Sequence, residues 1–508
     1  MKQYELFIDG DHTAAASRGT IESIDPATGA VVARVARAMP TDARRAIAAA
    51  RAAFDDGRWN SRPLEWRTEV LLSAVELLWS RRSQLAELEA LDTGIPIRTT
   101  TAMIASALHQ VRDLVNIAAG ICTVEPLPHN EFPSPVQNLL MRDPYGVCAA
   151  IVPFASPFAT AAWKVFAALA MGNTVVLKPS PSTPCTAMEL AVALDESGLP
   201  PGCLNVLCGA DARVGEELVT NTLVDHVAFT GSTDTGRTIG RIAAQTVKRV
   251  TLQLSGKSAN ILLDDADLDV AVPGALWAIY LAAGQTCRAG SRLLVPRKMA
   301  EEVTDRIVSA ATQLRVGPTL EWDTDFGPLA SRAQLERVER YVSVGRTDGA
   351  ALACGGHRLA EEALTHGFYY APTVFTAVRN DMRIAQEEIL GPVLSVIPYA
   401  DVEEAVAIAN ATIYGLAGAV WSRDVPRALS VAQRLRAGTV WINDYHMLTA
   451  TAPVGGYAQS GIGKELGIAG CLEYAQSKHV WVDQGRTLES HTWTPVIGID
   501  RIFGVTAE

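Results

Sequence analysis

Cys287 is the residue of this sequence best suited to covalent chemistry. It lies among small and cationic residues, in the stretch Gly-Gln-Thr-Cys-Arg-Ala-Gly-Ser-Arg at 284–292, directly after an apolar segment. A thiolate attacks carbonyl carbon, and a nearby cation or backbone N–H groups lower the pKa of a thiol and so favour the thiolate. Arg288 supplies such a cation. The stretch therefore predicts a nucleophile, and the alternative is a buried structural cysteine in a glycine-rich turn.

A second motif could bind phosphate. Residues 231–236 read Gly-Ser-Thr-Asp-Thr-Gly and lie between an expected strand and an expected helix. Backbone N–H groups at a helix N-terminus bind anions, although this motif is not the G-x-G-x-x-G fingerprint. The alternative is an ordinary turn. The residues predicted to meet a phosphate are Gly231, Ser232 and Gly236.

The elements that must position these motifs follow from the pattern of apolar residues. Short apolar runs alternate with helical patterns after residue 146, which predicts an α/β fold with an open parallel sheet. Strands are expected at 146–152, 173–178, 204–207, 224–229, 250–254, 393–398 and 439–443. Helices are expected at 41–54, 67–91, from about 157, and at 183–197, 213–220 and 235–244. Ligands bind beyond the carboxyl ends of such strands, where Lys178 and Gln253 lie.

Composition limits the class of protein and of partner. The chain has 508 residues, of which 48% are hydrophobic and 19% charged, so it can bury a large core and form more than one domain. Its net charge of −11 argues against nucleic acid or an anionic membrane as partner. Residues 147–171 are apolar, but Pro153 and Pro157 would break a membrane helix and Lys164 would be charged within it. We expect a small-molecule substrate and no membrane span.

Cysteine usage indicates the compartment. The eight cysteines are scattered, without C-x-x-C pairs or histidines at zinc-ligand spacing, so we expect no metal site. No export signal is recognisable in the first residues. Reduced thiols in a cytoplasm fit this pattern.

Six motifs in order give the chain a resemblance to the aldehyde dehydrogenase superfamily from about residue 8 to residue 481. They are Leu-Lys-Pro-Ser at 177–180, Phe-Thr-Gly-Ser-Thr at 229–233, Leu-Ser-Gly-Lys at 254–257, the cysteine stretch, Glu-Glu-Ile-Leu-Gly-Pro at 387–392 and Pro-Val-Gly-Gly-Tyr at 453–457. The resemblance implies an α/β fold with a Rossmann-type open parallel sheet in a cofactor-binding domain, an α/β catalytic domain and a small oligomerisation arm. The active site is expected in the cleft between the two domains.

The resemblance also implies the domain boundaries. The cofactor-binding domain is expected at residues 1–125 and 146–255, the catalytic domain at 256–465, the arm at 126–145 and 466–486, and a C-terminal tail at 487–508. Strand-like segments at 138–142 and 478–482 would form the arm and add strands to a neighbouring subunit, giving a homodimer or homotetramer. The alternative is two ordinary edge strands. The tail is too apolar to be simply solvated, so we expect it to dock on its own subunit or across an interface.

The implied cofactor is NAD or NADP. In the family a lysine contacts the adenosine ribose and a glutamate holds the nicotinamide ribose, and Lys178 and Glu388 match them. Pro181 stands where the family often has a ribose-binding glutamate, which leaves the choice of cofactor open. Leu390 and Phe154 replace a phenylalanine and a tryptophan near the nicotinamide. The cofactor-binding candidates are Pro153, Phe154, Lys178, Ser180, Gly231, Ser232, Gly236, Leu254, Glu388 and Leu390.

Two catalytic positions depart from the family pattern. Ala155 stands where the family has the asparagine that holds the oxyanion, and losing one such donor typically costs on the order of a hundred- to a thousand-fold in rate. Gln253 stands where the family has the glutamate that activates water, and general-base catalysis contributes roughly a hundred- to ten-thousand-fold. Lys164 and Glu465 match residues that relay protons in the family, and the alternative for both is a structural ion pair or helix cap.

The residues expected to line the substrate passage are Trp163, Tyr280, Arg288, Tyr445, His446 and Met447. Aromatic side chains with few fixed charges favour an apolar or aromatic aldehyde, whereas Arg288 beside the nucleophile leaves an anionic one open. Three functions compete. The first is an aldehyde dehydrogenase that deacylates by an unusual route, the second an acyl-transferring dehydrogenase that uses CoA or another thiol, and the third a catalytically impaired binding or scaffold protein.

Overall fold

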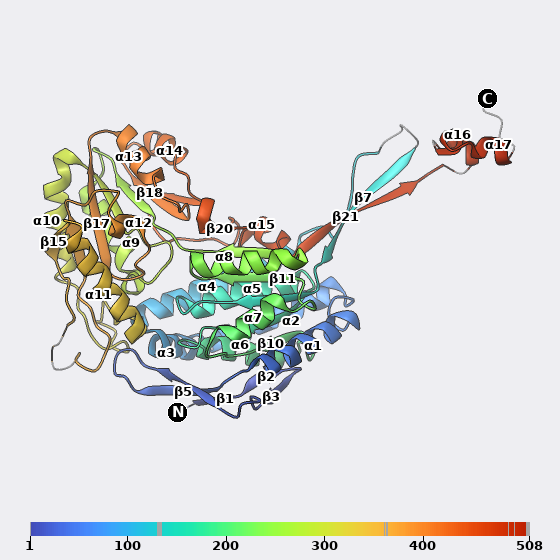
Figure 1. The fold of residues 1–508 in the computed structure, drawn as a ribbon, viewed down its shortest axis with the longest axis horizontal. Helices are drawn as coiled ribbons and strands as arrows, with labels where there is room; N and C mark the ends of the chain where they lie inside the picture. The colour runs from blue at the N-terminus through green and yellow to red at the C-terminus, as the bar shows by residue number, and fades with distance from the viewer. Residues whose placement is uncertain are drawn as a thin grey trace.

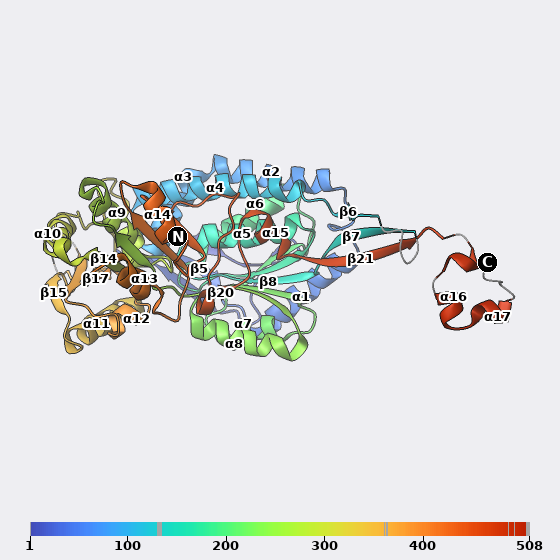
Figure 2. The same cartoon turned by 90° about the horizontal axis from the view of Figure 1, so that it is seen from above.

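The computed structural model describes residues 2–129, 135–359, 361, 364–485, 487–491 and 493–503. Two α/β units lie side by side, and a long β arm leaves the first unit on the side away from the second (Figure 1). The C-terminal tail lies beyond the far end of the arm in both views (Figures 1 and 2).

The first unit is built on an eight-stranded sheet. Its five central strands, β12-β11-β8-β9-β10, are parallel, and the three at its edges are antiparallel. In spatial order the strands are β20 (Gly461–Ile462), β12 (Arg249–Gln253), β11 (His226–Thr230), β8 (Val147–Ile151), β9 (Thr174–Lys178), β10 (Leu204–Val206), β2 (Leu6–Ile8) and β3 (Asp11–Thr13). A small sheet of β1 (Lys2–Tyr4), β5 (Val31–Ala36) and β4 (Thr20–Ile24) flanks this unit.

Helices cover both faces of this sheet (Figure 2). One face carries α1 (Pro40–Asp55), α7 (Ala212–Thr220) and α8 (Thr233–Ala243). The other carries α2 (Leu64–Ser80), α3 (Arg82–Thr93), α4 (Ile97–Ala119), α5 (Pro157–Ala170), α6 (Cys185–Glu196) and α15 (Gly467–Leu472). Val147 and Ala149 of β8 face the first set, and Cys148 and Ala150 face the second. Because side chains alternate along a strand, a strand buried on both faces reads as a continuous apolar run.

The second unit contains a seven-stranded sheet in which all neighbours except β15 and β16 are parallel. In spatial order its strands are β15 (Ala351–Cys354), β16 (Thr373–Thr376), β17 (Val393–Tyr399), β14 (Arg292–Pro296), β13 (Ala259–Leu262), β18 (Ala417–Trp421) and β19 (Thr439–Ile442). Its helices are α9 (Leu268–Tyr280), α10 (Ala300–Ala311), α11 (Arg332–Thr347), α12 (Arg383–Gln386), α13 (Val402–Asn410) and α14 (Val425–Ala432).

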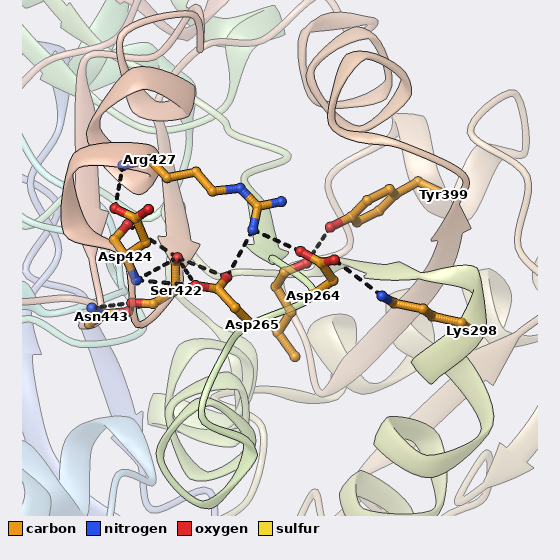
Figure 3. Close-up of polar contacts among 9 residues, drawn as sticks. Asp264, Asp265, Lys298, Tyr399, Ser422, Asp424, Arg427 and Asn443 are labelled. Atoms are coloured by element: carbon orange, nitrogen blue, oxygen red, sulfur yellow. Dashed lines mark hydrogen bonds and ion pairs between the residues drawn. The ribbon is translucent and has the colours of Figure 1, made fainter.

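A polar network joins the carboxyl ends of β13, β14 and β18 (Figure 3). Arg427 forms ion pairs with Asp264 and Asp265 just after β13, at 2.8 and 3.2 Å. Ser422, just after β18, donates to Asp265 at 2.8 Å, and Lys298, just after β14, pairs with Asp264 at 3.1 Å. The charges of this edge therefore neutralise one another.

The arm is a three-stranded antiparallel sheet of β21 (Ala475–Asp483), β7 (Val136–Pro144) and β6 (Val124–Pro126). Nine residues of β21 pair with β7, and Lys478 lies opposite Met141. The two segments expected at 138–142 and 478–482 are thus partners in one sheet. β21 has no second neighbour among the described strands, so its outer edge is unpaired.

The fold class is confirmed, and so are the strands expected in the first sheet and the helices expected around it, apart from the one at 67–91. The single helix expected at 67–91 is wrong, because the chain breaks at Arg81 into α2 and α3. Residues 461–474, which the expected boundaries divide between catalytic domain and arm, instead lie on the first unit: β20 pairs with β12, and Leu466, Cys471 and Tyr474 join its core. None of the described helices is long and apolar enough to cross a membrane.

The tail forms two short helices, α16 (Trp493–Val496) and α17 (Ile499–Phe503). Val496 is 81% exposed and Phe503 70% exposed, so these two side chains are not buried against their own subunit. The prediction that the tail docks on its own subunit is therefore wrong for these two side chains. Pro495 and Ile499, expected to contribute to docking, have side chains outside the described set.

Candidate active site

A cavity of about 680 Å³ lies between the two units, and Cys287 is in its wall. That volume is within the range of small-molecule sites. One part of the lining comes from the carboxyl ends of β8 and β11 and from the segment before β17, and includes Pro153, Phe154, Thr230, Gly231, Ser232, Glu388 and Leu390. The other part comes mainly from α4, α5, α9 and the segment after β19, and includes Met103, Gln110, Trp163, Trp277, His446 and Met447.

Strained backbone leads from α9 to the nucleophile. Ala282, Ala283 and Gly284 have φ values of 51°, 54° and 73°, so three successive residues are in the left-handed region. A Cβ on Gly284 would lie 2.2 Å from the carbonyl oxygen of Gly391, so only glycine fits there. The turn ends where the Gly290 N–H donates to the Ala278 carbonyl at 2.9 Å. Such strain is typical of segments that present catalytic groups.

Opposing effects act on the Cys287 thiol. Burial raises its pKa to about 11, the positive charge of Arg288 opposes this rise, and the charges of Glu388 and Glu465 add to it. Arg288 itself lies in the cavity wall, and its backbone carbonyl accepts a hydrogen bond from Tyr445 Oη at 2.9 Å. The thiol is therefore mostly protonated at neutral pH.

The expected phosphate loop begins where β11 ends. Ser232 caps α8, and its Oγ accepts from the Thr235 N–H at 3.3 Å. Gly231 and Ser232 line the cavity. A Cβ on Gly236 would lie 2.4 Å from Leu254 Cδ2, so Gly236 lets α8 pack closely on the chain after β12. Gly236 and Leu254 thus support the loop from outside the cavity lining.

The Glu388 carboxylate is held in place by two donors. Ser255 Oγ donates to its Oε2 at 2.6 Å, and the Gly256 N–H donates to its Oε1 at 3.3 Å. Burial raises its pKa, while these hydrogen bonds and the charges of Arg337 and Lys257 oppose the rise. A fixed acceptor at the cavity wall and a helix N-terminus beyond it fit the ribose hydroxyls and the pyrophosphate of a dinucleotide.

Lys178 and Ser180 lie outside the cavity lining. Lys178 is the last residue of β9, and its Nζ donates to the Pro179 carbonyl at 3.4 Å. Burial lowers its pKa. Its side chain runs beside α7, about 3.9 Å from where a Cβ of Gly215 would be.

The two departing positions differ in their placement. Ala155 lines the cavity just before Ser156, the N-cap of α5, which has φ 49°. Gln253 is the last residue of β12 and lies outside the lining, 5% exposed, with its Nε2 donating to the Val454 carbonyl at 3.4 Å. Neither side chain has a carboxylate. The Ala155 side chain also has no hydrogen-bond donor.

Lys164 and Glu465 form a buried ion pair that joins α5 to the chain before α15. Both lie outside the cavity lining. The pair fits the structural alternative, and each charge is compensated by the other.

Two residues expected in the substrate passage do not line it. Tyr280 is buried in the core of the second unit against Phe326, with ring centroids 6.0 Å apart. Tyr445 is fully buried, and its Oη donates a hydrogen bond to the backbone carbonyl of Arg288. Both expectations fail because a sequence does not show whether an aromatic side chain points into the core or into the cavity.

The other expected passage residues, Trp163, Arg288, His446 and Met447, do line it. Trp163 Nε1 donates to Gln110 Oε1 at 3.1 Å, and His446 Nε2 meets the Ala278 carbonyl at 3.1 Å. Burial and then the charge of Arg288 lower the pKa of His446 well below its usual value, so its ring is neutral.

Sequence reasoning missed several lining residues. Those on α4 are Thr99, Ala102, Met103, Ser106, Ala107 and Gln110, which share one helix face but carry no distinguishing chemistry. Trp277 had a signal, since it is a large aromatic residue in the helix that leads to Cys287.

Comparison with known proteins agrees with this geometry. The model of the aldehyde dehydrogenase family matches residues 12–480. A Bacillus subtilis betaine aldehyde dehydrogenase is 43% identical over 479 residues, covering 94% of this chain and 96% of that protein. An aldehyde dehydrogenase from Bacillus cereus, solved with NAD⁺, has a TM-score of 0.92 and 40% identity, covering 95% of this chain and 97% of the other. Betaine aldehyde dehydrogenase from Staphylococcus aureus with NAD⁺ has a TM-score of 0.93 and 37% identity, covering 95% and 96%.

The chain belongs to the aldehyde dehydrogenase family, which confirms the resemblance of its motifs. The class of enzyme is an NAD(P)-dependent aldehyde dehydrogenase.

Proposed function

We propose that this chain oxidises an aldehyde to the carboxylic acid through a covalent intermediate on Cys287, with NAD⁺ or NADP⁺ as cofactor. One observation carries the proposal: Cys287 shares a single cavity with the loop at Ser232, the carboxylate of Glu388 and an aromatic-lined pocket. The first two fit a dinucleotide, and the pocket fits the organic part of an aldehyde.

The residues act in sequence. After losing its proton, the Cys287 sulfur adds to the aldehyde carbon, and the carbonyl electron pair becomes an oxyanion. When bound, the cofactor would supply at its nicotinamide the acceptor for the hydride that leaves the thiohemiacetal carbon, so that a thioester would remain on Cys287. Water then adds to the thioester carbon, the C–S bond breaks, and the acid and the thiolate are released. Glu388 and Ser232 hold the cofactor, while Trp163, His446 and Met447 surround the aldehyde.

Deacylation is proposed to be slow. An amide at Gln253 can orient a water molecule but cannot take its proton, and Ala155 offers no hydrogen bond to the oxyanion. An acyl acceptor other than water, such as CoA, would not need a base at Gln253. That alternative leaves Ala155 without an explanation.

We also propose that the first unit binds the cofactor, that the second carries the nucleophile, and that the arm joins subunits into a dimer or tetramer. The unpaired edge of β21 supports the last point, because such an edge can pair with another chain. Lys164 and Glu465 are assigned to proton relay or to holding α5 in place. A cytoplasmic enzyme is supported by the eight cysteines, all of which are free thiols.

Rapid mixing of enzyme, cofactor and aldehyde tests the proposal. We expect a burst of reduced cofactor approaching one equivalent per site, a slow steady phase, and an acyl mass adduct that is absent in Cys287→Ser. If added CoA makes the steady phase as fast as the burst, the acyl-transferring alternative is favoured. Neither burst nor adduct with any aldehyde would favour the impaired scaffold.

A further inference from the structure

Arg288 carries a positive charge that is partly buried in the cavity wall and has no ion-pair partner among the described residues. Its side chain lies in the wall of the cavity beside Cys287. Its Nε is buried without a hydrogen-bond partner, and no ion pair forms between its guanidinium and any carboxylate in the described ranges. Burial lowers its pKa, but a guanidinium stays charged at neutral pH.

The nearest carboxylates are committed elsewhere. Glu465 is paired with Lys164, and Glu388 is held by Ser255 and Gly256 on the cofactor side. A partly buried charge without an ion-pair partner is unfavourable unless something else supplies the opposite charge.

On the substrate side of the cavity, the described residues offer no opposite charge. Among the described residues, Glu388 is the only carboxylate that lines the cavity. Arg98, the other cation of the substrate side, is half exposed and paired with Asp325 at 2.5 Å. The substrate side is therefore positive at Arg288, which attracts an anionic substrate and repels a cationic one.

We propose that the substrate is an aldehyde bearing a carboxylate, and that Arg288 binds this carboxylate while the aldehyde carbon meets Cys287. Guanidinium and carboxylate form paired, charge-assisted hydrogen bonds. Because the two residues are adjacent, the aldehyde and carboxylate ends are only a few carbons apart. This inference rests on the proposed function. It also separates the chain from relatives named for betaine aldehyde, whose quaternary ammonium the Arg288 charge would repel.

The first test compares three short aldehydes by the second-order rate constant of the burst: succinate semialdehyde, butanal and betaine aldehyde. We expect the anionic aldehyde to react fastest and the cationic one slowest. In Arg288→Gln the ratio of anionic to neutral rates should fall by about 10- to 100-fold, since charged hydrogen bonds of this kind have that strength. Arg288→Lys should retain part of the ratio.

Arg98→Gln is the matched control, because it removes a cation that lines the same cavity but already has a partner. Its ratio should stay within about two-fold of wild type. The ratio also cancels the effect of Arg288 on Cys287 itself, which is common to all three aldehydes.

The second test needs no turnover. Iodoacetate and iodoacetamide alkylate thiolates and differ in charge, so their rate ratio at Cys287, relative to the ratio at a small free thiol, reports anion attraction. We expect this relative ratio to exceed one and to fall at least several-fold in Arg288→Gln. If no aldehyde reduces either cofactor but this shift appears, the proposed oxidation fails and the carboxylate site stands.

Two outcomes would overturn the inference. One is an unchanged alkylation ratio in Arg288→Gln. The other is a burst that slows equally for all three aldehydes, which would assign the guanidinium to the oxyanion instead.

Discussion

The Cys287 thiol has to lose a proton in a setting that disfavours its charged form. Burial raises its pKa from the usual value to about 11, so the thiolate fraction at pH 7 is small. Since the alkylation rate follows the thiolate, we predict that iodoacetamide labelling of Cys287 rises about ten-fold per pH unit from pH 7 to pH 10. Mass spectrometry of Cys287 labelling measures it.

Removing the nearby cation should shift this profile in a known direction. The charge of Arg288 lowers the Cys287 pKa, so Arg288→Gln should move the labelling profile to higher pH. A wild-type profile that levels off below pH 9 would contradict the effect of burial.

Gln253→Glu should restore a base. A carboxylate of the same length, placed at the end of β12, can accept a proton from water. We predict that the steady phase accelerates roughly a hundred- to ten-thousand-fold while the burst changes little. Gln253→Met is the control, since it keeps the length without any base, and its steady phase should stay slow. Equal acceleration in both variants would show that the amide was only an obstruction.

Ala155→Asn should act on the earlier step. An amide in the cavity wall can donate to the oxyanion, so the burst is predicted to accelerate by up to roughly a hundred-fold, with a smaller effect on the steady phase. Ala159→Asn adds the same group to the same cavity, but from the first turn of α5, and should not accelerate the burst. Stopped-flow absorbance of the reduced cofactor separates the two.

Single residues were predictable from sequence where a local motif fixed their place. Cys287, Ser232 and Glu388 follow or precede strands in such motifs, and all three line the cavity. Tyr280 and Tyr445 were not, because the direction of a side chain depends on partners distant in sequence, such as Phe326. The missing partner of Arg288 was equally hidden, since a sequence does not show which charges pair.

At the scale of elements, the turn after α9 determines where the nucleophile lies. Gly284→Ala combines a left-handed φ of 73° with a Cβ 2.2 Å from the Gly391 carbonyl oxygen. We predict a loss of more than about 3 kcal/mol in the free energy of unfolding, together with slower labelling of Cys287. Urea unfolding measures the first effect.

Gly349→Ala is the matched control for that variant. Gly349 has φ 92°, but nothing lies within 4 Å of a Cβ there. It should lose only about 1 to 2 kcal/mol, the cost of the left-handed conformation alone. Equal losses in the two variants would show that contact with Gly391 does not matter.

The two sheets present the site from opposite edges. In the first, Ser232 and Gln253 lie at the carboxyl ends of β11 and β12, as expected for such sheets. In the second, Cys287 and Glu388 precede β14 and β17 and so lie at the amino edge, while the network of Asp264 and Arg427 occupies the carboxyl edge. The site at the carboxyl ends of β11 and β12 could be predicted from the sequence, because ligands bind at that edge of such sheets. The site at the amino edge of the second sheet could not, because no general rule places ligands there.

Strand prediction succeeded where strands are buried on both faces. β8, β9 and β11 appear within two residues of the expected bounds because each contains at least three successive buried apolar residues. β2, β3 and β20 are only two or three residues long, and each is defined by its partner rather than by its own sequence. Their positions could not be derived from local patterns.

At the scale of the whole molecule, the arm and tail predict assembly. Among the described strands β21 has only one neighbour, and the tail lies beyond the arm (Figure 1). Val496 and Phe503 of the tail are exposed. We predict a dimer or tetramer by light scattering at micromolar concentration. A chain ending at Asp483 keeps the arm and should show weaker association, with a dissociation constant raised at least several-fold. A full-length monomer would contradict both expectations.

The first unit contains elements from both ends of the chain: strands β2 and β3 near the start, and strand β20 and helix α15 near the end, with the entire second unit between them. This has a consequence for protein synthesis. On the ribosome the core of the first unit cannot be completed until Cys471 and Tyr474 have emerged, long after Cys287 has been translated. The contacts of Gln253 with Val454 and of Lys164 with Glu465 form only at that stage. A nascent chain that stalls in the second unit therefore exposes a cysteine without an active site, and release of the full chain is what creates the enzyme.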